Sequence, residues 1–174
     1  RRPLDLDWLV GFWRSRGALG PLAEMLELSL HERLIEPDLQ RAQKDPVDVD
    51  RTMAALERIG AALVLQGLCD IAVPDSGLDL SDSRPALDLA GILPDWSGEH
   101  RASLMSRAMF DPASAGLVRL HNDNQGSVRS YLTARWFKRL MDDNCPRSEV
   151  ADLLFATTYG VHLGIPSMRQ TAAW

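Results

Sequence analysis

The stretch from Asp48 to Gly67 constrains the fold of this chain more than any other segment. Its apolar residues recur with the 3.6-residue period of an α-helix and form a single stripe. The stripe consists of Met53, Leu56, Ile59, Gly60, Leu63 and Val64. Asp48 or Asp50 is suited to cap the start of such a helix, and glycine is a frequent residue just past a helix end. The segment therefore predicts one long amphipathic helix with close neighbours.

Similar periodicity predicts further helices on both sides of this one. The apolar spacing and the turn residues place them at about 4–17, from Gly20-Pro21 to Pro37, from Ser97 to just before Pro112, at 127–142, and from 149 to about 161 after a cap at Ser148. Another helix begins near Pro166. Trp8, Trp13 and Trp136 stand at helical core spacing, where large aromatic side chains most often fill space.

The predicted helix at 127–142 differs from the others in its pattern. Its apolar residues surround most of the circumference instead of forming one stripe, which indicates contacts on several sides. They are Val128, Tyr131, Leu132, Trp136, Phe137, Leu140 and Met141. We therefore expect this helix to be central in the fold.

Strand signals are short and few. Ile71 to Val73 is an extended piece, and Leu117 to Leu120 alternates briefly before a turn that contains Gly126. The stretch 75–85 is rich in Asp, Ser, Gly and Pro and is typical of a loop. The fold class predicted from the residues is mainly α, with one or two short strands.

Composition limits the classes of protein that the sequence fits. The 174 residues are enough for one domain or two small ones, and 45% of them are hydrophobic, as in ordinary globular proteins. No apolar run approaches the ~20 residues that cross a bilayer, so no membrane partner is expected. Cys69 and Cys145 lack the spacing of a zinc site or a disulfide framework, which favours free thiols in the cytoplasm. Because the start lacks Met and the end at Trp174 interrupts a helix, we expect an excised fragment.

No complete catalytic motif is present in the sequence. A phosphate-binding loop needs the pattern GxxxxGK[ST], and neither Lys44 nor Lys138 follows a glycine. The four histidines have no metal-ligand spacing, and GxSxG is absent. The prediction is that the chain by itself is not an enzyme, has no catalytic or metal-binding residues and binds no cofactor alone.

Positive charge is concentrated on the helix at 127–142. Arg129, Arg135, Lys138 and Arg139 lie there without an acidic residue between them, an arrangement that suits a DNA major groove. The net charge of -5 and the large apolar residues between these cations favour burial against protein instead. Nucleic acid is therefore an unfavoured partner.

Several segments together resemble one family. Phe110-Asp111-Pro112, the strand 116–121 ending in His121, and the helical run from Val128 to Trp136 carry the resemblance. Further support comes from 92–96, from 2–9 and from 165–167 with 172–174. This pattern is similar to that of bacterial STAND-type NTPases, the NACHT-like signalling ATPases of antiviral defence.

The resemblance implies a domain organisation. Residues 1–43 resemble the helical domain that follows the ATPase core, 44–143 the winged-helix-like domain, and 144–174 the start of a C-terminal helical repeat region. The implied partners are an upstream ATPase core and a downstream repeat sensor of the same chain, with homo-oligomerisation on activation. ADP and ATP are the implied cofactors of the parent, which the resemblance implies is an ATPase, and the fragment is implied to be a regulatory piece.

His121 is the candidate site residue. The resemblance implies that it contacts the β-phosphate of bound ADP and so senses the nucleotide. From the residues alone, the favoured interpretation of His121 is a partly buried histidine bonded to a nearby carbonyl. A winged-helix DNA-binding regulator and a helical scaffold without a ligand are the alternative functions.

Overall fold

The computed structural model of the chain is built mainly of helices, as the sequence predicts. It describes residues 3–35, 47–73, 85–121, 123 and 126–174. The helices are α1 (Pro3–Arg16), α2 (Leu22–Leu34), α4 (Val49–Gln66), α5 (Leu89–Ile92), α6 (Gly98–Met105), α7 (Ser127–Asp142), α8 (Arg147–Leu154) and α9 (Arg169–Ala173), which follows the 3-10 turn η1 (Pro166–Met168). The strands are β1 (Asp70–Ala72), β2 (Ala86–Leu87), β3 (Phe110–Ser114), β4 (Leu117–Leu120), β5 (Phe155–Thr158) and β6 (Val161–Gly164).

Helix α4 forms where the apolar stripe predicts it. Of the two candidate caps the structure uses Asp48, whose carboxylate accepts a hydrogen bond from the backbone N–H of Arg51 at 2.7 Å. Gly67 ends the helix with a φ of 65°, a left-handed conformation that glycine adopts without strain. Leu56 and Ile59 are fully buried. The long helix therefore supplies one wall of the main hydrophobic core.

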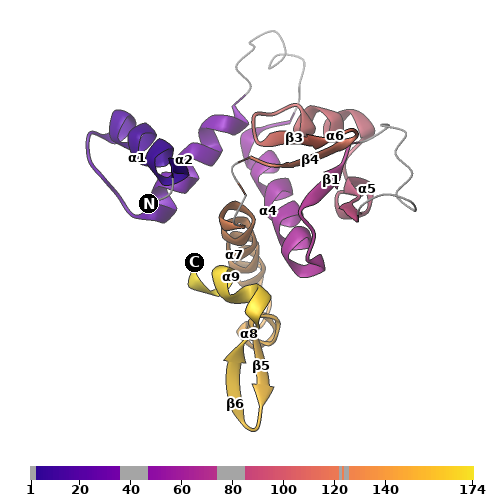
Figure 1. Cartoon of the computed structure of the whole chain (residues 1–174). Helices are drawn as coiled ribbons and strands as arrows, with labels where there is room; N and C mark the ends of the chain where they lie inside the picture. Colours follow the sequence, from indigo (N-terminus) through magenta and orange to yellow (C-terminus); the bar gives the residue numbers. More distant parts are fainter. Residues whose placement is uncertain (1–2, 36–46, 74–84, 122, 124–125) are drawn as a thin grey trace.

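Helix α7 lies along α4 and is central, as its all-round apolar pattern predicts (Figure 1). Gly60 of α4 permits the close approach, since a Cβ atom built there would lie 2.6 Å from the Cβ of Leu132. Leu132 itself is completely buried. On its other sides α7 packs against α8 and α9 through Phe137 and the apolar residues around it.

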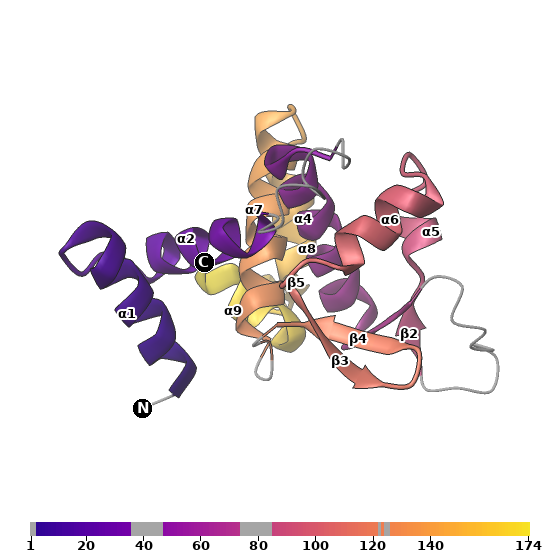
Figure 2. The same ribbon diagram turned by 90° about the horizontal axis from the view of Figure 1, so that it is seen from above.

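A small sheet packs on this helical core with the strand order β2-β1-β4-β3 (Figure 2). Strand β1 pairs parallel with β2 and antiparallel with β4, and β3 and β4 form an antiparallel hairpin. Along the chain, helix α4 is followed by β1 and the short strand β2, then by helices α5 and α6, and then by the β3–β4 hairpin. Apart from β2, this order is winged-helix-like. Helix α7 begins seven residues after β4 ends.

The sheet contains more strands than the sequence predicts. The short strands at 70–72 and 117–120 confirm two predictions, but β2 and β3 were not anticipated. The helix predicted from Ser97 to just before Pro112 is too long, because α6 ends at Met105 and β3, which contains Pro112, already begins at Phe110. Because β3 is an edge strand with a register shift between Pro112 and Ser114, a residue without an N–H is tolerated there.

The prediction of a helix from 149 to about 161 is wrong in its second half. Helix α8 ends at Leu154, and the chain continues as the β5–β6 hairpin. The hairpin turns at Tyr159 and Gly160, whose φ values of 51° and 77° are typical of a two-residue type I′ turn. Ser148 does not cap α8 either, because that helix begins at Arg147.

The two N-terminal helices pack against each other and extend away from the sheet (Figure 2). Phe12 of α1 and Leu26, Leu30 and Leu34 of α2 join the main core. Trp13 does not, because 55% of its surface is exposed, so the prediction that it fills the core is wrong. The predicted loop at 75–85 and most of the connector at 41–48 lie outside the described residues. Within the described ranges, no helix is long and apolar enough to span a membrane.

Candidate functional site

The candidate site is the junction between strand β4 and helix α7. His121 directly follows β4, and its backbone N–H donates to the carbonyl of Met109 at 2.7 Å, which continues the β3–β4 pairing by one residue. Leu120 points into the core beside it and is 2% exposed. The strand thus fixes the backbone of His121 and leaves its side chain at the rim of the sheet.

The imidazole of His121 is held by a carboxylate. Its Nδ1 lies 2.8 Å from Oδ1 of Asp111 on the neighbouring strand β3. The His121 side chain is 23% exposed and that of Asp111 is 49% exposed. His121 is therefore half-buried. Its partner is a carboxylate, whereas the interpretation of His121 as a structural histidine predicted a backbone carbonyl.

This contact decides which ring nitrogen is free. A carboxylate can only accept, so Nδ1 carries the proton that it shares with Asp111, and Nε2 is left for another partner. In neutral imidazole Nε2 is then an acceptor, and only the imidazolium form donates from both nitrogens. An anionic ligand at Nε2 therefore requires the protonated ring, while Nδ1–H stays bonded to Asp111.

Asp123 organises the start of α7. Its Oδ1 accepts hydrogen bonds from the backbone N–H groups of Val128 at 3.0 Å and Arg129 at 3.2 Å. These are two of the donors that a helix N-terminus leaves without an intrahelical partner. The preceding Gly126 has a φ of 74°, and a Cβ atom there would lie 3.1 Å from the Arg129 guanidinium. Only glycine fits this turn without displacing that side chain.

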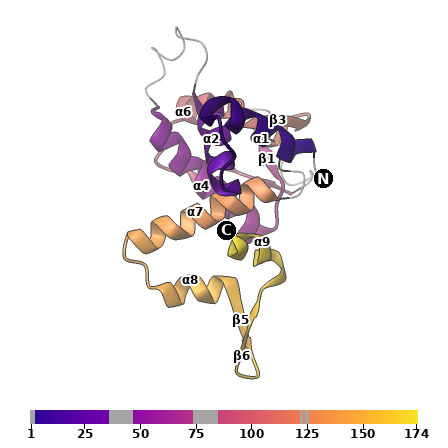
Figure 3. The same cartoon turned by 90° about the vertical axis from the view of Figure 1, so that its left-hand side faces the viewer.

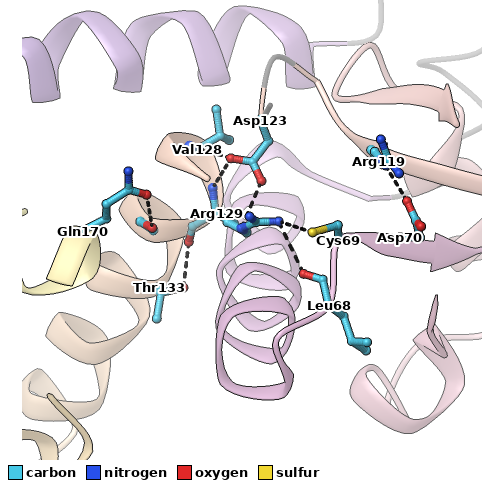
Figure 4. A network of polar contacts seen from close by, with 10 residues as sticks. Leu68, Cys69, Asp70, Arg119, Asp123, Val128, Arg129, Thr133 and Gln170 are labelled. Atoms are coloured by element: carbon cyan, nitrogen blue, oxygen red, sulfur yellow. Dashed lines mark hydrogen bonds and ion pairs between the residues drawn. The ribbon is translucent and has the colours of Figure 1, made fainter. Parts of the chain in front are cut away.

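Arg129 connects the turn to the far end of α4 (Figure 4). Its Nε lies 3.5 Å from Oδ2 of Asp123, and its Nη1 donates to the carbonyl of Leu68 at 3.4 Å and to Sγ of Cys69 at 3.0 Å. One turn further along α7, the hydroxyl of Thr133 donates to the carbonyl of Arg129. The guanidinium is thereby held against the protein, and the side chain is 22% exposed.

A second ion pair fixes β1 to β4. The guanidinium of Arg119 pairs with Asp70, whose side chain is only 2% exposed. Figure 4 shows both pairs, which are linked through the neighbouring residues Cys69 and Asp70. The residues around His121 thus form an ordered polar network in which each arginine already has a carboxylate partner.

The pKa of Asp123 is raised to about 6, because burial of the carboxylate outweighs the opposing effects of Arg129 and the two backbone N–H groups. In the unfolded chain the pKa of this carboxyl group is 3.8, so below that pH it is protonated in both the folded and the unfolded protein. Between about 4 and 6 the folded protein holds the proton more tightly than the unfolded chain does. The stabilisation from that proton is complete below pH 4 and is lost as the pH rises through about 6.

We predict that Asp123→Asn reduces this pH dependence. In the protein that keeps Asp123, titration of this carboxyl group should lower the free energy of unfolding by about 1 to 3 kcal/mol between pH 4 and pH 6.5. Asparagine keeps an oxygen for the cap but does not titrate, so the fall should be smaller in the variant. Urea titrations at a series of pH values test this. Equal pH profiles for the two proteins would contradict the prediction.

The four basic residues of α7 do not form a free cationic face. Arg135 pairs with Glu27 and with Oε1 of Glu57, and Arg139 pairs with Oε2 of Glu57 at 2.6 Å. Lys138 pairs with Asp142 one turn along the helix. Together with the contact of Arg129 with Asp123, each cation has an acidic partner. The sequence shows the cations side by side but not the carboxylates that neutralise them from α2 and α4.

A hollow of about 780 Å³ lies between α7, α8 and α9. Tyr131 and Trp174 line it with their rings in an edge-to-face contact at 5.2 Å, and the paired side chains of Arg135, Arg139 and Glu57 form its polar wall. His121 does not line this hollow. The two features are separate parts of the molecule.

Metal ligands and disulfides do not explain the site. In the described part of the chain, no group of three or more His, Cys, Asp or Glu side chains is arranged to hold a metal ion. Cys69 and Cys145 are free thiols.

Comparison of the chain with protein-family models, curated proteins and solved structures gives no match. The functional argument therefore depends on the geometry of the winged-helix-like unit and of the junction at His121.

Proposed function

We propose that this chain is the helical and winged-helix-like regulatory region of a STAND-type NTPase, in which His121 senses bound nucleotide. The parent protein would act in signalling or antiviral defence in the bacterial cytoplasm. The observation that carries the proposal is the position of His121, which closes strand β4, has Nδ1 bonded to Asp111 and leaves Nε2 for a ligand.

The order of the elements supports this assignment. A pair of helices precedes a winged-helix-like unit, and the residues that resemble the family, 110–121 and 128–136, lie in the β3–β4 hairpin and in helix α7, which is the next element along the chain. The helix pair also exposes apolar side chains, with Val10 46% and Trp13 55% exposed. An upstream ATPase core packed on this face would cover them.

The proposed mechanism uses the imidazolium form of His121. With Nδ1–H bonded to Asp111, Nε2–H can donate a charge-assisted hydrogen bond to a phosphate oxygen of ADP held by the ATPase core. That bond exists only while the winged-helix-like unit is closed on the core. It stabilises the closed, inactive state, and exchange for ATP would release the unit for homo-oligomerisation.

We predict that His121→Ala in the parent protein weakens ADP retention. Loss of a hydrogen bond to a charged group costs about 1.5 to 3 kcal/mol, so ADP release should accelerate at least about tenfold and basal activity should rise. Release of a fluorescent ADP analogue measures the first effect. Unchanged release from a folded variant would refute the nucleotide-sensing role.

Asp111→Asn provides the matched control. It keeps the side-chain volume and one acceptor oxygen for Nδ1 of His121, but it removes the carboxylate charge. We expect ADP to be lost more slowly from this variant than from His121→Ala, because the imidazole that contacts the phosphate is still present. The chain without its parent ATPase core should bind ADP negligibly.

A winged-helix DNA-binding regulator is the second candidate, because α5 and α6 are arranged as a helix-turn-helix pair. The second helix of such a pair, α6, enters the groove, and not α7. Glu99 and Ala102 are exposed on α6, and Ser106 is exposed just after it. Arg101 donates to the carbonyls of Leu93 and Trp96 and is held against the protein. The turn of the β3–β4 hairpin carries no basic residue.

We predict that the chain does not bind duplex DNA at physiological salt. The exposed surface of α6 lacks a free cation among the described residues, and the cations of α7 are paired. Fluorescence anisotropy with a labelled duplex, repeated at several salt concentrations, measures binding. Submicromolar affinity that weakens steeply with added salt would favour the DNA-binding function. A helical scaffold without a ligand would show neither DNA binding nor an effect of His121→Ala.

A further inference from the structure

The β5–β6 hairpin projects from the body of the protein beyond α8 (Figures 1 and 3). All eight strand residues are exposed, and Tyr159 at the tip is completely exposed. An isolated two-stranded hairpin is only marginally stable in water and gains stability from a third strand or a packing partner. The surface of this hairpin is therefore a candidate for an interaction with another chain.

The outer edge of β6 has unpaired backbone groups. The N–H of Ile165 donates to the carbonyl of Leu154, which makes these two residues a hydrogen-bonded pair. From there along the hairpin, non-hydrogen-bonded and hydrogen-bonded pairs alternate. His162 and Gly164 consequently direct their N–H and C=O groups outward, and no described residue bonds to them. On β5 the equivalent N–H of Phe155 is already used by the carbonyl of Ala151. The β6 edge is thus the more open of the two.

This edge lacks the features that normally protect an exposed strand. Natural edge strands carry lysine, other charges, proline or a bulge, which prevent pairing with a second chain. From Leu153 to Ile165 the sequence has no Asp, Glu, Lys, Arg or Pro, and the ladder of the hairpin is regular. Valine, leucine, phenylalanine and threonine instead give it high strand propensity.

One face of the hairpin borders a hollow of about 540 Å³. Its apolar wall consists of Ala156 and Leu163 from the two strands and Ile165 and Pro166 beyond them. Arg169 lines the other end, is exposed, and forms no ion pair or hydrogen bond with any residue that the structure describes. The hollow thus combines space for an aliphatic side chain with a cation that lacks a carboxylate partner.

We propose that the β6 edge is a docking site for an extended segment of another protein, which adds as a third strand. The segment places an aliphatic side chain in the hollow against Leu163 and a carboxylate on Arg169. Backbone hydrogen bonds to His162 and Gly164 provide the pairing, and the hollow and Arg169 provide the selectivity. This function is separate from nucleotide sensing at His121.

Charge complementarity favours such a partner over a second copy of this chain. In antiparallel pairing of two β6 edges, each Arg169 would face the tip of the other hairpin. The tip, residues 158–161, has no acidic side chain. The arginine would remain without a carboxylate in that arrangement.

The test uses the whole chain and short capped peptides of alternating valine and threonine, with aspartate at the first or the last position. Matched peptides carry asparagine instead. We expect one aspartate peptide to bind at least about tenfold more tightly than its asparagine counterpart. The backbone amides of His162 and Gly164 should exchange more slowly with solvent when the peptide is bound.

Variants of the hairpin separate the contributions. Arg169→Gln should remove the preference for aspartate, and Leu163→Lys should abolish binding. Tyr159→Lys introduces the same charge at the tip, outside the hollow, and should leave binding unchanged. Thermal unfolding confirms that each variant is folded.

Three results would overturn the proposal. The first is that none of the peptides binds. The second is that aspartate and asparagine peptides bind equally and Arg169→Gln has no effect. The third is a concentration-dependent dimer that Leu163→Lys dissociates, which would assign the edge to a second copy of the chain.

Discussion

Gly60→Ala is expected to destabilise the protein, although alanine is the better helix former. In an exposed helix interior the exchange would stabilise the fold by about 0.8 to 1 kcal/mol. At Gly60 the added Cβ would lie 2.6 Å from the Cβ of Leu132 and 3.2 Å from the carbonyl of Arg129. Neither is the end of a flexible side chain, so α4 and α7 must separate. We expect a net loss of about 1 to 3 kcal/mol in the free energy of unfolding.

Gly11→Ala is the matched control for this prediction. Gly11 also lies inside a helix, α1, and no atom is within 4 Å of a Cβ built there. The exchange should therefore be neutral or stabilising. Urea unfolding of both variants gives the comparison. If Gly60→Ala were as stable as Gly11→Ala, the close packing of α4 on α7 would not be required for the fold.

Glu57→Ala should have the largest effect of any single charge removal considered. The Glu57 side chain is 1% exposed and accepts from Nε of Arg135 at 2.9 Å and from Nε of Arg139 at 2.6 Å. Removing it leaves the half-buried guanidinium of Arg135 and the exposed guanidinium of Arg139 without their shared anion, and only Arg135 keeps a second partner, Glu27. Because breaking a buried pair costs about 3 to 5 kcal/mol and these arginines retain partial solvent access, we expect about 3 kcal/mol.

Two further variants separate charge from packing at this position. Glu57→Gln keeps the shape and one acceptor oxygen, so it should lose less stability than Glu57→Ala. Combining Glu57→Ala with Arg139→Ala removes one of the stranded cations, and the double variant should recover part of the loss. Additive effects in this double-mutant cycle would show that Glu57 and Arg139 are not coupled.

The helical skeleton could be predicted because it depends on local rules. The period of Met53, Leu56, Ile59 and Leu63 and the cap at Asp48 define α4 within the chain itself. The apolar circumference of α7 likewise indicates a helix with neighbours on several sides, and the structure confirms it. In both helices the residues that form the buried face lie within a few turns of one another in the sequence, so their pattern is visible without knowledge of the fold.

The errors occur where pairing with another segment decides the structure. The stretch from Phe155 to Gly164 has residues that suit a helix or a strand, and the turn at Tyr159-Gly160, which selects a hairpin, was not recognised in the sequence. Strand β3 contains Pro112, which alone would argue against a strand. Segment 110–114 is nevertheless a strand, because it pairs with β4 at the edge of the sheet, where a residue without an N–H is tolerated.

The candidate site was predictable only in part. The sequence places His121 after a strand and before a helix, and the structure confirms that placement. It gives no indication that Asp111 holds Nδ1, because that contact crosses the β3–β4 hairpin. Asp123 was missed altogether, because it lies three residues before the N-cap Gly126, outside the position where a capping Asp is normally expected.

By itself, the sequence determined the mainly α class, the bounds of α4 and α7 and the location of His121, because periodicity, caps and turns act over a few residues. Only the tertiary structure decided which charges are available. In the sequence, Arg129, Arg135 and Arg139 suggest a basic helix face. In the structure they form ion pairs with Asp123, Glu27 and Glu57, which belong to other segments. Coulombic pairing acts through space between elements distant in the chain, so the surface potential of this protein is a property of its fold and not of its sequence pattern.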